Sequence, residues 1–550
     1  MELLILLCCF IVGLSGKPIV VGKLGRISGR IQRVLDVDIE FFLGIPYAEP
    51  PVGEHRFALP RAFGAVGEVE ATEYGPSCLQ PSSGPLAPEN RKLSEDCLRL
   101  NVFRRQGTNV NDKKAVIVTL HGGGFVAGSS SDPLQNTAAL AGLGDVVVVS
   151  LNYRLGILGF ADMKEFAPGN LGLRDQRLAL EWVQDYIADF GGDPGRVTVM
   201  GVSAGSMSIA AQIITPIDER NLFSSVVMDA GVVASNGFHE DSDSSYSRLT
   251  KIAEQVGCPL HSLEMVDCLR KIEAERLIAF SLNTTGDNGI SYFVATLDGD
   301  FIPREVEDYV RENSSNLRKV RTIIGYARDE GSFFVSSKFM AKDHPNPEST
   351  DEVMAYMELL SQNYDYPLNF GEEKTRELLS RLYIERHPND SLAAIASLQS
   401  DGIFKCSINN FIRSYTQYNE EVYVYQFERE LKSVYAKILD PNILGAFHLS
   451  PFLHFCGSLF LGPEPLHPDD RTFILESIDL ISRFAKAVEP IEFRGLKWPR
   501  FAESEEVLYL HETPWVRDGL PSEHNCRALF QSSNNALPKK SSNIKLRTEL

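Results

Sequence analysis

The chain has 550 residues, 43% of them hydrophobic, which is enough apolar material to bury a large core. Its 54 basic and 73 acidic residues give a formal net charge of −19, and this balance argues against nucleic acid or an anionic membrane surface as a partner. Neutral and cationic small molecules remain compatible with the charge.

The first predicted element is a signal peptide over residues 1–16. An apolar run from Leu3 to Leu14 is followed by small residues that suit cleavage, and the run is too short to span a membrane. A buried strand or an amphipathic anchor is the alternative for this segment. From the leader we expect entry into the secretory pathway. No later stretch reaches the roughly 18 apolar residues of a membrane-spanning helix, so we expect no transmembrane anchor.

Five apolar, strand-like runs alternate with longer helical or mixed stretches. This alternation indicates an α/β fold with a large, mostly parallel central sheet flanked by helices. A helix is predicted over Leu173–Phe190, where large side chains recur every four residues. We expect one large domain, residues 17–530, and a polar tail, residues 531–550. The predicted strands are Lys114–Leu120, Asp145–Leu151, Arg196–Gly201, Val320–Tyr326 and Val422–Phe427.

The cysteines fit an exported protein. Of the nine, Cys8 and Cys9 lie in the predicted leader, and the rest are an odd number without metal-type CxxC spacing. Three disulfides and one free thiol are therefore expected, with no metal site. Three Asn-X-Ser/Thr sequences mark candidate glycosylated surface loops, at Asn283, Asn313 and Asn389.

The stretch GVSAGS, residues 201–206, marks Ser203 as a candidate nucleophile. A GxSxG run can hold its serine on a strained strand-to-helix turn, and here a β-branched run precedes it and a helix-forming run follows. An ordinary small-residue turn is the alternative. Upstream, HGGGF (His121–Phe125) directly follows a predicted strand, where side-chain-free residues let main-chain N–H groups approach a developing oxyanion.

Several longer stretches together resemble the carboxylesterase/cholinesterase family of α/β-hydrolases, over nearly the whole chain from about Lys17 to residue 530. The resemblance implies the α/β-hydrolase fold. It also implies disulfides pairing Cys78 with Cys97, Cys258 with Cys268 and Cys406 with Cys526, with Cys456 free. The stretches are FLGIPYAEPPVGEHRF (42–57), SEDCLRLNV (94–102), HGGGF, NYRLGILGF (152–160), GNLGLRDQRLALEWV (169–183) and FGGDPGRVTVMGVSAG (190–205).

The same resemblance assigns a catalytic triad. GYARDEGSFF (325–334) resembles the segment that carries the acid, which maps to Glu330, with Asp329 as its rival; GAFHLSPFLHFCG (445–457) resembles the segment that carries the base, His448, with His454 as its rival. Serine, acid and histidine then follow in the chain order of this fold. Main-chain N–H groups of Gly123, Gly124 and Ala204 are expected to bind the oxyanion, and the reaction needs no metal or organic cofactor.

Three departures from the family pattern keep a second function open. Val202 stands where the family commonly has glutamate, Ala230 stands where it commonly has serine, and the residues after His448 read LSP where small and acidic residues are usual. When two polar groups that support each other are both replaced by apolar ones, the effect on stability can be nearly neutral. We therefore interpret Val202 and Ala230 as a coupled change. The alternative is a catalytically weak or inactive member that acts as a ligand-binding or interaction protein.

The expected substrate is a small neutral ester rather than a choline ester. Choline-selective relatives hold the cation against a tryptophan in the first disulfide loop, and Cys78–Cys97 here contains no aromatic residue. The tail lacks the aromatic-bearing helix with which some cholinesterases tetramerise, and the oligomeric state stays open. The final RTEL, residues 547–550, resembles weak retrieval signals of the endoplasmic reticulum lumen; secretion is our expectation and retention the alternative.

Overall fold

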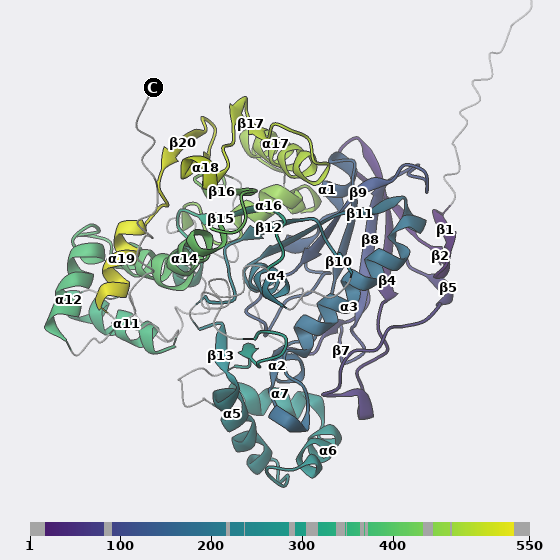
Figure 1. The fold of residues 1–550 in the computed structure, drawn as a ribbon, viewed down its shortest axis with the longest axis horizontal. Helices are drawn as coiled ribbons and strands as arrows, with labels where there is room; N and C mark the ends of the chain where they lie inside the picture. Colours follow the sequence, from purple (N-terminus) through teal and green to yellow (C-terminus); the bar gives the residue numbers. More distant parts are fainter. Residues whose placement is uncertain are drawn as a thin grey trace, which may run out of the picture.

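An eleven-stranded mixed sheet forms the centre of the molecule in the part of the chain that the structure describes (Figure 1). The structure is a computed structural model. It describes residues 17–81, 91–215, 220–235, 237–284, 292–303, 317–336, 347, 349–363, 368, 372–432, 444–462 and 465–532. In spatial order the strands are β20 (Trp515–Asp518), β19 (Glu506–Leu510), β16 (Val422–Phe427), β15 (Arg321–Ala327), β12 (Ser225–Asp229), β11 (Gly192–Val202), β9 (Lys114–Leu120), β10 (Val147–Leu151), β8 (Arg99–Arg105), β4 (Val37–Pro46) and β3 (Arg30–Val34).

The strands from β19 to β10 run parallel, and antiparallel strands complete both edges. The α/β class and the α/β-hydrolase sheet expected from the sequence are thus confirmed, and the antiparallel strands at both edges make the sheet mixed. Each central strand is an apolar run because helices cover both of its faces. Alternate residues of β9 accordingly lie in two separate cores, Val116 and Val118 in one and Ala115 and Ile117 in the other.

Helices on the two faces of the sheet build these cores (Figure 1). On one face, α3 (Leu171–Tyr186) and α4 (Ala204–Ile214) pack against β11, and the large apolar stripe of α3 includes the buried Trp182. On the other face lie α1 (Ala138–Leu143), α16 (Ser450–Cys456) and α17 (Pro468–Ala485). The predicted helix Leu173–Phe190 is therefore present, although its last turn, Ile187–Phe190, is a 3₁₀ helix.

Two helical groups flank the sheet (Figure 1). The group at the bottom of the view contains α5 (Ser242–Gln255), α6 (Leu263–Lys271) and α7 (Ala274–Leu282). The group at the left contains α11 (Thr350–Asn363), α12 (Glu373–Leu379), α14 (Cys406–Tyr415) and α19 (Glu523–Ser532), and α13 (Ser391–Gln399) packs against α11. The left-hand group has a small core of its own, which includes Met357, Leu379 and Ile395.

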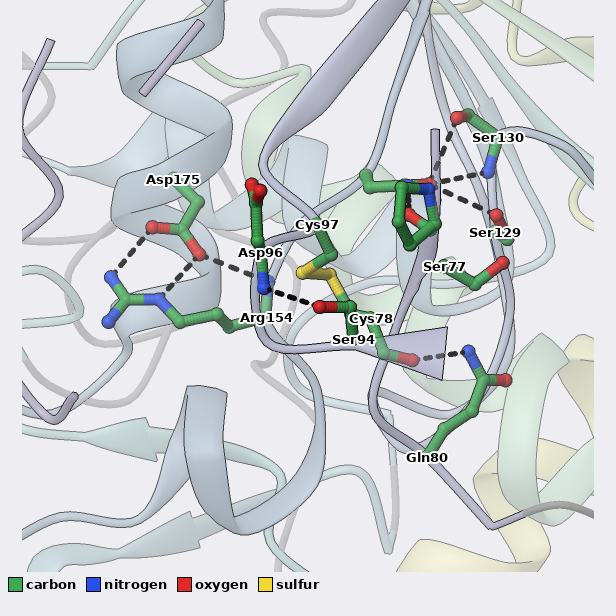
Figure 2. Close-up of a disulfide and its surroundings, with 12 residues drawn as sticks. Ser77, Cys78, Gln80, Ser94, Asp96, Cys97, Ser129, Ser130, Arg154 and Asp175 are labelled. Atoms are coloured by element: carbon green, nitrogen blue, oxygen red, sulfur yellow. Dashed lines mark hydrogen bonds and ion pairs between the residues drawn. A yellow bond between two sulfur atoms is a disulfide. The ribbon is translucent and has the colours of Figure 1, made fainter. Parts of the chain in front are cut away.

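All three predicted disulfides are present, and Cys456 is a free, buried thiol. Figure 2 shows the bridge between Cys78 and Cys97, where the Gln80 side-chain amide donates a hydrogen bond to the Cys78 carbonyl oxygen at 2.9 Å. The Cys406–Cys526 bridge joins positions 120 residues apart and ties α19 to the start of α14. Cross-links of this kind lower the entropy of the unfolded chain.

Several sequence predictions fall outside the described residues. The leader (1–16), Asn313 and RTEL are among them. The predicted domain end at residue 530 lies inside α19, which continues to Ser532. Asn283 and Asn389 are described, and both side chains are exposed in turns. Within the described ranges, no helix combines the length and the apolar character needed to cross a bilayer.

Candidate active site

Ser203 lies at the turn between β11 and α4. Its backbone is in an unusual region, with φ 56° and ψ −126°, and it is the residue directly before the first residue of the helix. A positive φ is costly for a residue with a side chain, so the surrounding structure must hold it in place. This strained strand-to-helix turn is the geometry that a GxSxG nucleophile requires.

The glycines around Ser203 are dictated by close packing. A Cβ on Gly205 would lie 2.1 Å from the Leu120 carbonyl oxygen at the end of β9, and a Cβ on Gly201 would lie 2.5 Å from the main chain of Gly205. A Cβ on Gly122 would lie 3.1 Å from the Ser203 Cβ. The HGGGF segment and the GVSAGS turn are therefore in contact, and larger residues would force them apart.

The three predicted oxyanion donors lie where these two segments meet. Gly123 and Gly124 both have positive φ, 121° and 61°, and neither N–H group donates a hydrogen bond within the described part of the chain. Ala204 is the first residue of α4, so its N–H has no partner in its own helix. The loop is braced by His121, whose buried ring donates to the Gly122 carbonyl oxygen at 2.9 Å; burial lowers the pKa of His121 to about 4.

Glu330 and His448 are joined directly. The ring Nδ1–H of His448 donates a hydrogen bond to Glu330 Oε2, and the Ala327 N–H donates to Glu330 Oε1 at 2.6 Å. The Glu330 side chain is fully buried and the His448 side chain is 3% exposed. Because Nδ1 carries the proton in this bond, the other ring nitrogen, Nε2, is left as a base. No hydrogen bond joins His448 to Ser203 in the described residues; such contacts often tighten only when substrate binds.

The two rival residues have other partners. Asp329 accepts hydrogen bonds from the Ala446 N–H at 3.0 Å and from Arg328, and its side chain is about one-third exposed. His454 is fully buried on α16, where its Nδ1–H donates to the Ser450 carbonyl oxygen at 2.7 Å. Neither side chain makes a hydrogen bond to His448.

The LSP sequence that follows His448 fits the start of α16. Leu449 takes a left-handed conformation, with φ 82°, and Pro451 falls in the first turn of α16, where a proline costs no intrahelical hydrogen bond. His448 immediately precedes this turn. The LSP sequence is therefore compatible with the contact between His448 and Glu330.

Aromatic side chains that sequence reasoning did not assign surround the His448 ring. The Phe404 ring stacks on it with centroids 4.7 Å apart, and the Phe334 ring lies 5.4 Å away. Phe404 belongs to a π-helical turn, Ser400–Lys405, and π-helical turns often occur at functional sites. The π-helical turn is seen only in the structure, and no motif in the sequence indicates that Phe404 contacts His448.

Within the described residues, no group of three or more His, Cys, Asp or Glu side chains could hold a metal ion. Ser203, Glu330 and the oxyanion candidates follow the carboxyl ends of three parallel strands, β11, β15 and β9, with β12 between β11 and β15. This edge of an open α/β sheet is where ligands bind in such folds. The arrangement suits acyl transfer: it combines a serine on a strained turn, a buried carboxylate–histidine pair, and main-chain N–H groups without a partner among the described residues.

Comparison with known proteins agrees with this geometry. A model of the carboxylesterase family matches residues 16–528. The chain is 34% identical over 417 residues to an acetylcholinesterase of Danio rerio, and the aligned region covers 73% of this chain and 65% of that protein. It is 30% identical over 525 residues to a cholinesterase of Mus musculus, covering 91% and 85%, and 30% identical over 518 residues to carboxylesterase 3 of Homo sapiens, covering 90% and 88%. These relatives indicate a carboxylic ester hydrolase, and the protein belongs to the carboxylesterase family.

Proposed function

We propose that the protein is a serine carboxylesterase that hydrolyses neutral carboxylic esters through an acyl-enzyme intermediate. The observation that carries the proposal is the buried hydrogen bond from His448 to Glu330, at the same edge of the sheet as the strained turn of Ser203. A serine hydroxyl is a weak nucleophile at neutral pH, and a base oriented by a carboxylate is the usual means of activating it.

In the proposed reaction, His448 Nε2 takes the proton from Ser203 Oγ as the oxygen attacks the ester carbonyl. Glu330 holds the imidazole in the required tautomer and stabilises the imidazolium that forms. His448 then passes the proton to the leaving alcohol, and the acyl group stays on Ser203. Water repeats the attack with the same base, which releases the acid and restores the enzyme.

The N–H groups of Gly123, Gly124 and Ala204 are proposed to bind the oxyanion of both tetrahedral intermediates. Donors of this kind are worth about 3 to 4 kcal/mol each in the transition state. The positive φ of both glycines supports this role because it turns consecutive N–H groups in a way that residues with side chains rarely adopt.

A fluorophosphonate probe tests the nucleophile. We expect it to label the wild-type protein once, at Ser203, and to leave Ser203→Ala unlabelled. Ser208→Ala is the matched control, because Ser208 is a buried serine of α4, the helix that follows Ser203, and its hydroxyl donates to the Ala204 carbonyl oxygen. Folded wild-type protein that takes up no probe would refute the proposal and favour an inactive ligand-binding or interaction protein.

Glu330→Gln tests the acid. The substitution keeps the shape of the side chain but favours the wrong histidine tautomer, so kcat for an aryl ester should fall by about 10²- to 10⁴-fold with KM nearly unchanged. Asp329→Asn is the comparison. If Glu330→Gln turned over normally and Asp329→Asn did not, the acid would be Asp329.

The preference for neutral esters is part of the proposal. All three tryptophans of the chain pack against other rings: Trp182 against Tyr186 and Phe190, Trp498 against Tyr423 and Tyr425, and Trp515 against Tyr509. A cation over an indole gains about 0.5 to 2 kcal/mol. In the described part of the chain, the rings in contact with His448 are those of Phe333, Phe334 and Phe404, and none of them is an indole.

The test compares kcat/KM for a thiocholine ester with its uncharged carbon isostere at about 0.15 M salt, where screening limits long-range attraction by the net charge. We expect similar values for the two esters. A preference for the cation above about thirtyfold, or about 2 kcal/mol, would show that another aromatic group supplies a choline site.

We further propose that the protein enters the secretory pathway and is secreted. The three disulfides support this location, as do the exposed side chains of Asn283 and Asn389 as glycan acceptors. Deleting RTEL and comparing medium with cell lysate tests it. A large rise in export after the deletion would show retention in the endoplasmic reticulum.

A further inference from the structure

Asp229 is a buried carboxyl group at the candidate site that the proposed reaction does not use. It is the last residue of β12, the strand between β11 and β15, and its side chain is completely buried. β11 leads to Ser203 and β15 leads to Glu330. Asp229 therefore occupies the strand end between the nucleophile and the acid.

Besides its pairing in the sheet, Asp229 accepts three hydrogen bonds from described residues around the candidate site. Its carbonyl oxygen accepts from the Ser203 N–H at 2.9 Å. Its Oδ1 accepts from the Tyr425 hydroxyl at 2.7 Å, and its Oδ2 accepts from the Phe452 N–H at 3.1 Å.

The contact with Phe452 falls on the helix that follows the base. Phe452 is the third residue of α16, and no side chain caps the N-terminus of this helix from Leu449. The first N–H groups of a helix lack intrahelical partners, and Pro451 has no N–H to offer. Asp229 therefore supplies from a distant strand the acceptor that a local cap supplies in other helices.

We propose that Asp229 is a positioning residue of the esterase: its main chain holds the Ser203 turn and its side chain holds the start of α16, so that His448 stays in register with Ser203. This inference rests on the proposed function. Asp229 touches neither the substrate nor the reacting atoms; it acts through the two residues that do.

The proposed role depends on hydrogen bonding rather than on charge. Among the described residues, Asp229 interacts with the titratable groups of Glu330 from the loop after β15, Tyr425 from β16 and Cys456 from α16, and none of these three is a cation. Burial, followed by the charge of Glu330, raises the pKa of Asp229 well above its ordinary value. A neutral Asn can make both side-chain bonds, with its oxygen accepting from Phe452 and its NH₂ donating to Tyr425.

The experiment compares Asp229→Ala with Asp229→Asn in the full-length enzyme, using an aryl ester. We expect Asp229→Ala to lower kcat by roughly 10- to 100-fold, with KM changed by less than about threefold, because misplacing a catalytic group costs the reaction rather than ground-state binding. Asp229→Asn should keep kcat within about threefold of wild type and leave the pH midpoint of kcat/KM unchanged. Asp229→Ser, also too short to reach Phe452, replaces the alanine variant if that variant does not fold.

Each outcome decides a different point. Wild-type protein without esterase activity would refute the proposed function, and this inference with it. Active wild type together with wild-type kcat in folded Asp229→Ala or Asp229→Ser would refute the positioning role alone. Loss of kcat in Asp229→Asn as large as in Asp229→Ala, or a shifted pH midpoint, would assign the effect to the charge and overturn the inference as stated.

Discussion

The buried histidine of α16, His454, should make the stability of the protein depend on pH. Its ring packs against Phe427 and Phe473, with centroids 5.0 Å and 5.5 Å away, and Nε2 has no hydrogen-bond partner among the described residues. Burial lowers its pKa from 6.5 to about 4. The perturbation we propose is His454→Phe, which keeps an aromatic ring at this position and removes the titration.

The sign follows from where the proton binds. The folded state disfavours the charged ring, so this contribution to stability is fully present above pH 6.5 and is lost as the pH falls from 6.5 towards 4. With pKa values of 6.5 in the unfolded chain and about 4 in the folded protein, the loss between pH 8 and pH 5 is about 2 kcal/mol. That amount is a large fraction of the net stability of a typical protein, about 5 to 15 kcal/mol.

Urea unfolding at pH 8 and pH 5, with the disulfides intact, measures this term. Other groups titrate over the same range, so the relevant quantity is the difference between wild type and variant. We expect wild type to lose about 2 kcal/mol more than His454→Phe between the two pH values. His524→Phe, at an exposed histidine of α19, is the control and should behave as wild type. A wild-type excess below about 0.5 kcal/mol would refute the reasoning.

Three further predictions concern packing and cross-linking. Gly205→Ala should lower the free energy of unfolding by about 3 kcal/mol, since its Cβ would lie 2.1 Å from a main-chain oxygen; unchanged urea stability would contradict this. Phe404→Ala should lower kcat up to about tenfold, the equivalent of one aromatic contact, through looser placement of His448; a change in KM alone would argue against it. Replacing both Cys406 and Cys526 by Ser should cost about 5 kcal/mol on the chain-entropy model, and a melting temperature equal to wild type would exclude that contribution.

The central strands could be predicted from sequence because their signal is local. Lys114–Leu120 and Val422–Phe427 coincide with β9 and β16, since a strand covered on both faces must be a continuous apolar run. The antiparallel edge strands, such as Arg30–Val34, were not predicted. That strand is mostly half-buried and carries charged residues, so it lacks both the apolar run and a clean alternation.

The residues of the candidate site likewise fall into those that the sequence predicts and those that it does not. GVSAGS and HGGGF are contiguous motifs, so the sequence reports them, although Gly122 and Gly205 are required by contacts between the two motifs. Asp229 and Phe404 act on the histidine from a separate strand and from a π-helical turn. The sequence shows the departure from the family pattern at Ala230, next to Asp229. Nothing local to Asp229 predicts its hydrogen bond with Phe452, more than 200 residues later in the chain.

The register of the sheet explains why apolar residues at 202 and 230 are compatible with an ordered site. Val202 pairs with Asp229, and Asp229 pairs with Gly325, so the ends of β11, β12 and β15 lie side by side. The Ser203 N–H donates to Asp229, and the Ala230 N–H donates to Gly325, each at 2.9 Å. Main-chain bonds thus hold these turns without help from the side chains of Val202 and Ala230, which are both fully buried. A polar group added at only one of the two positions would have to find its own partner or cost about 1 to 3 kcal/mol, and for that reason the two positions are expected to change together.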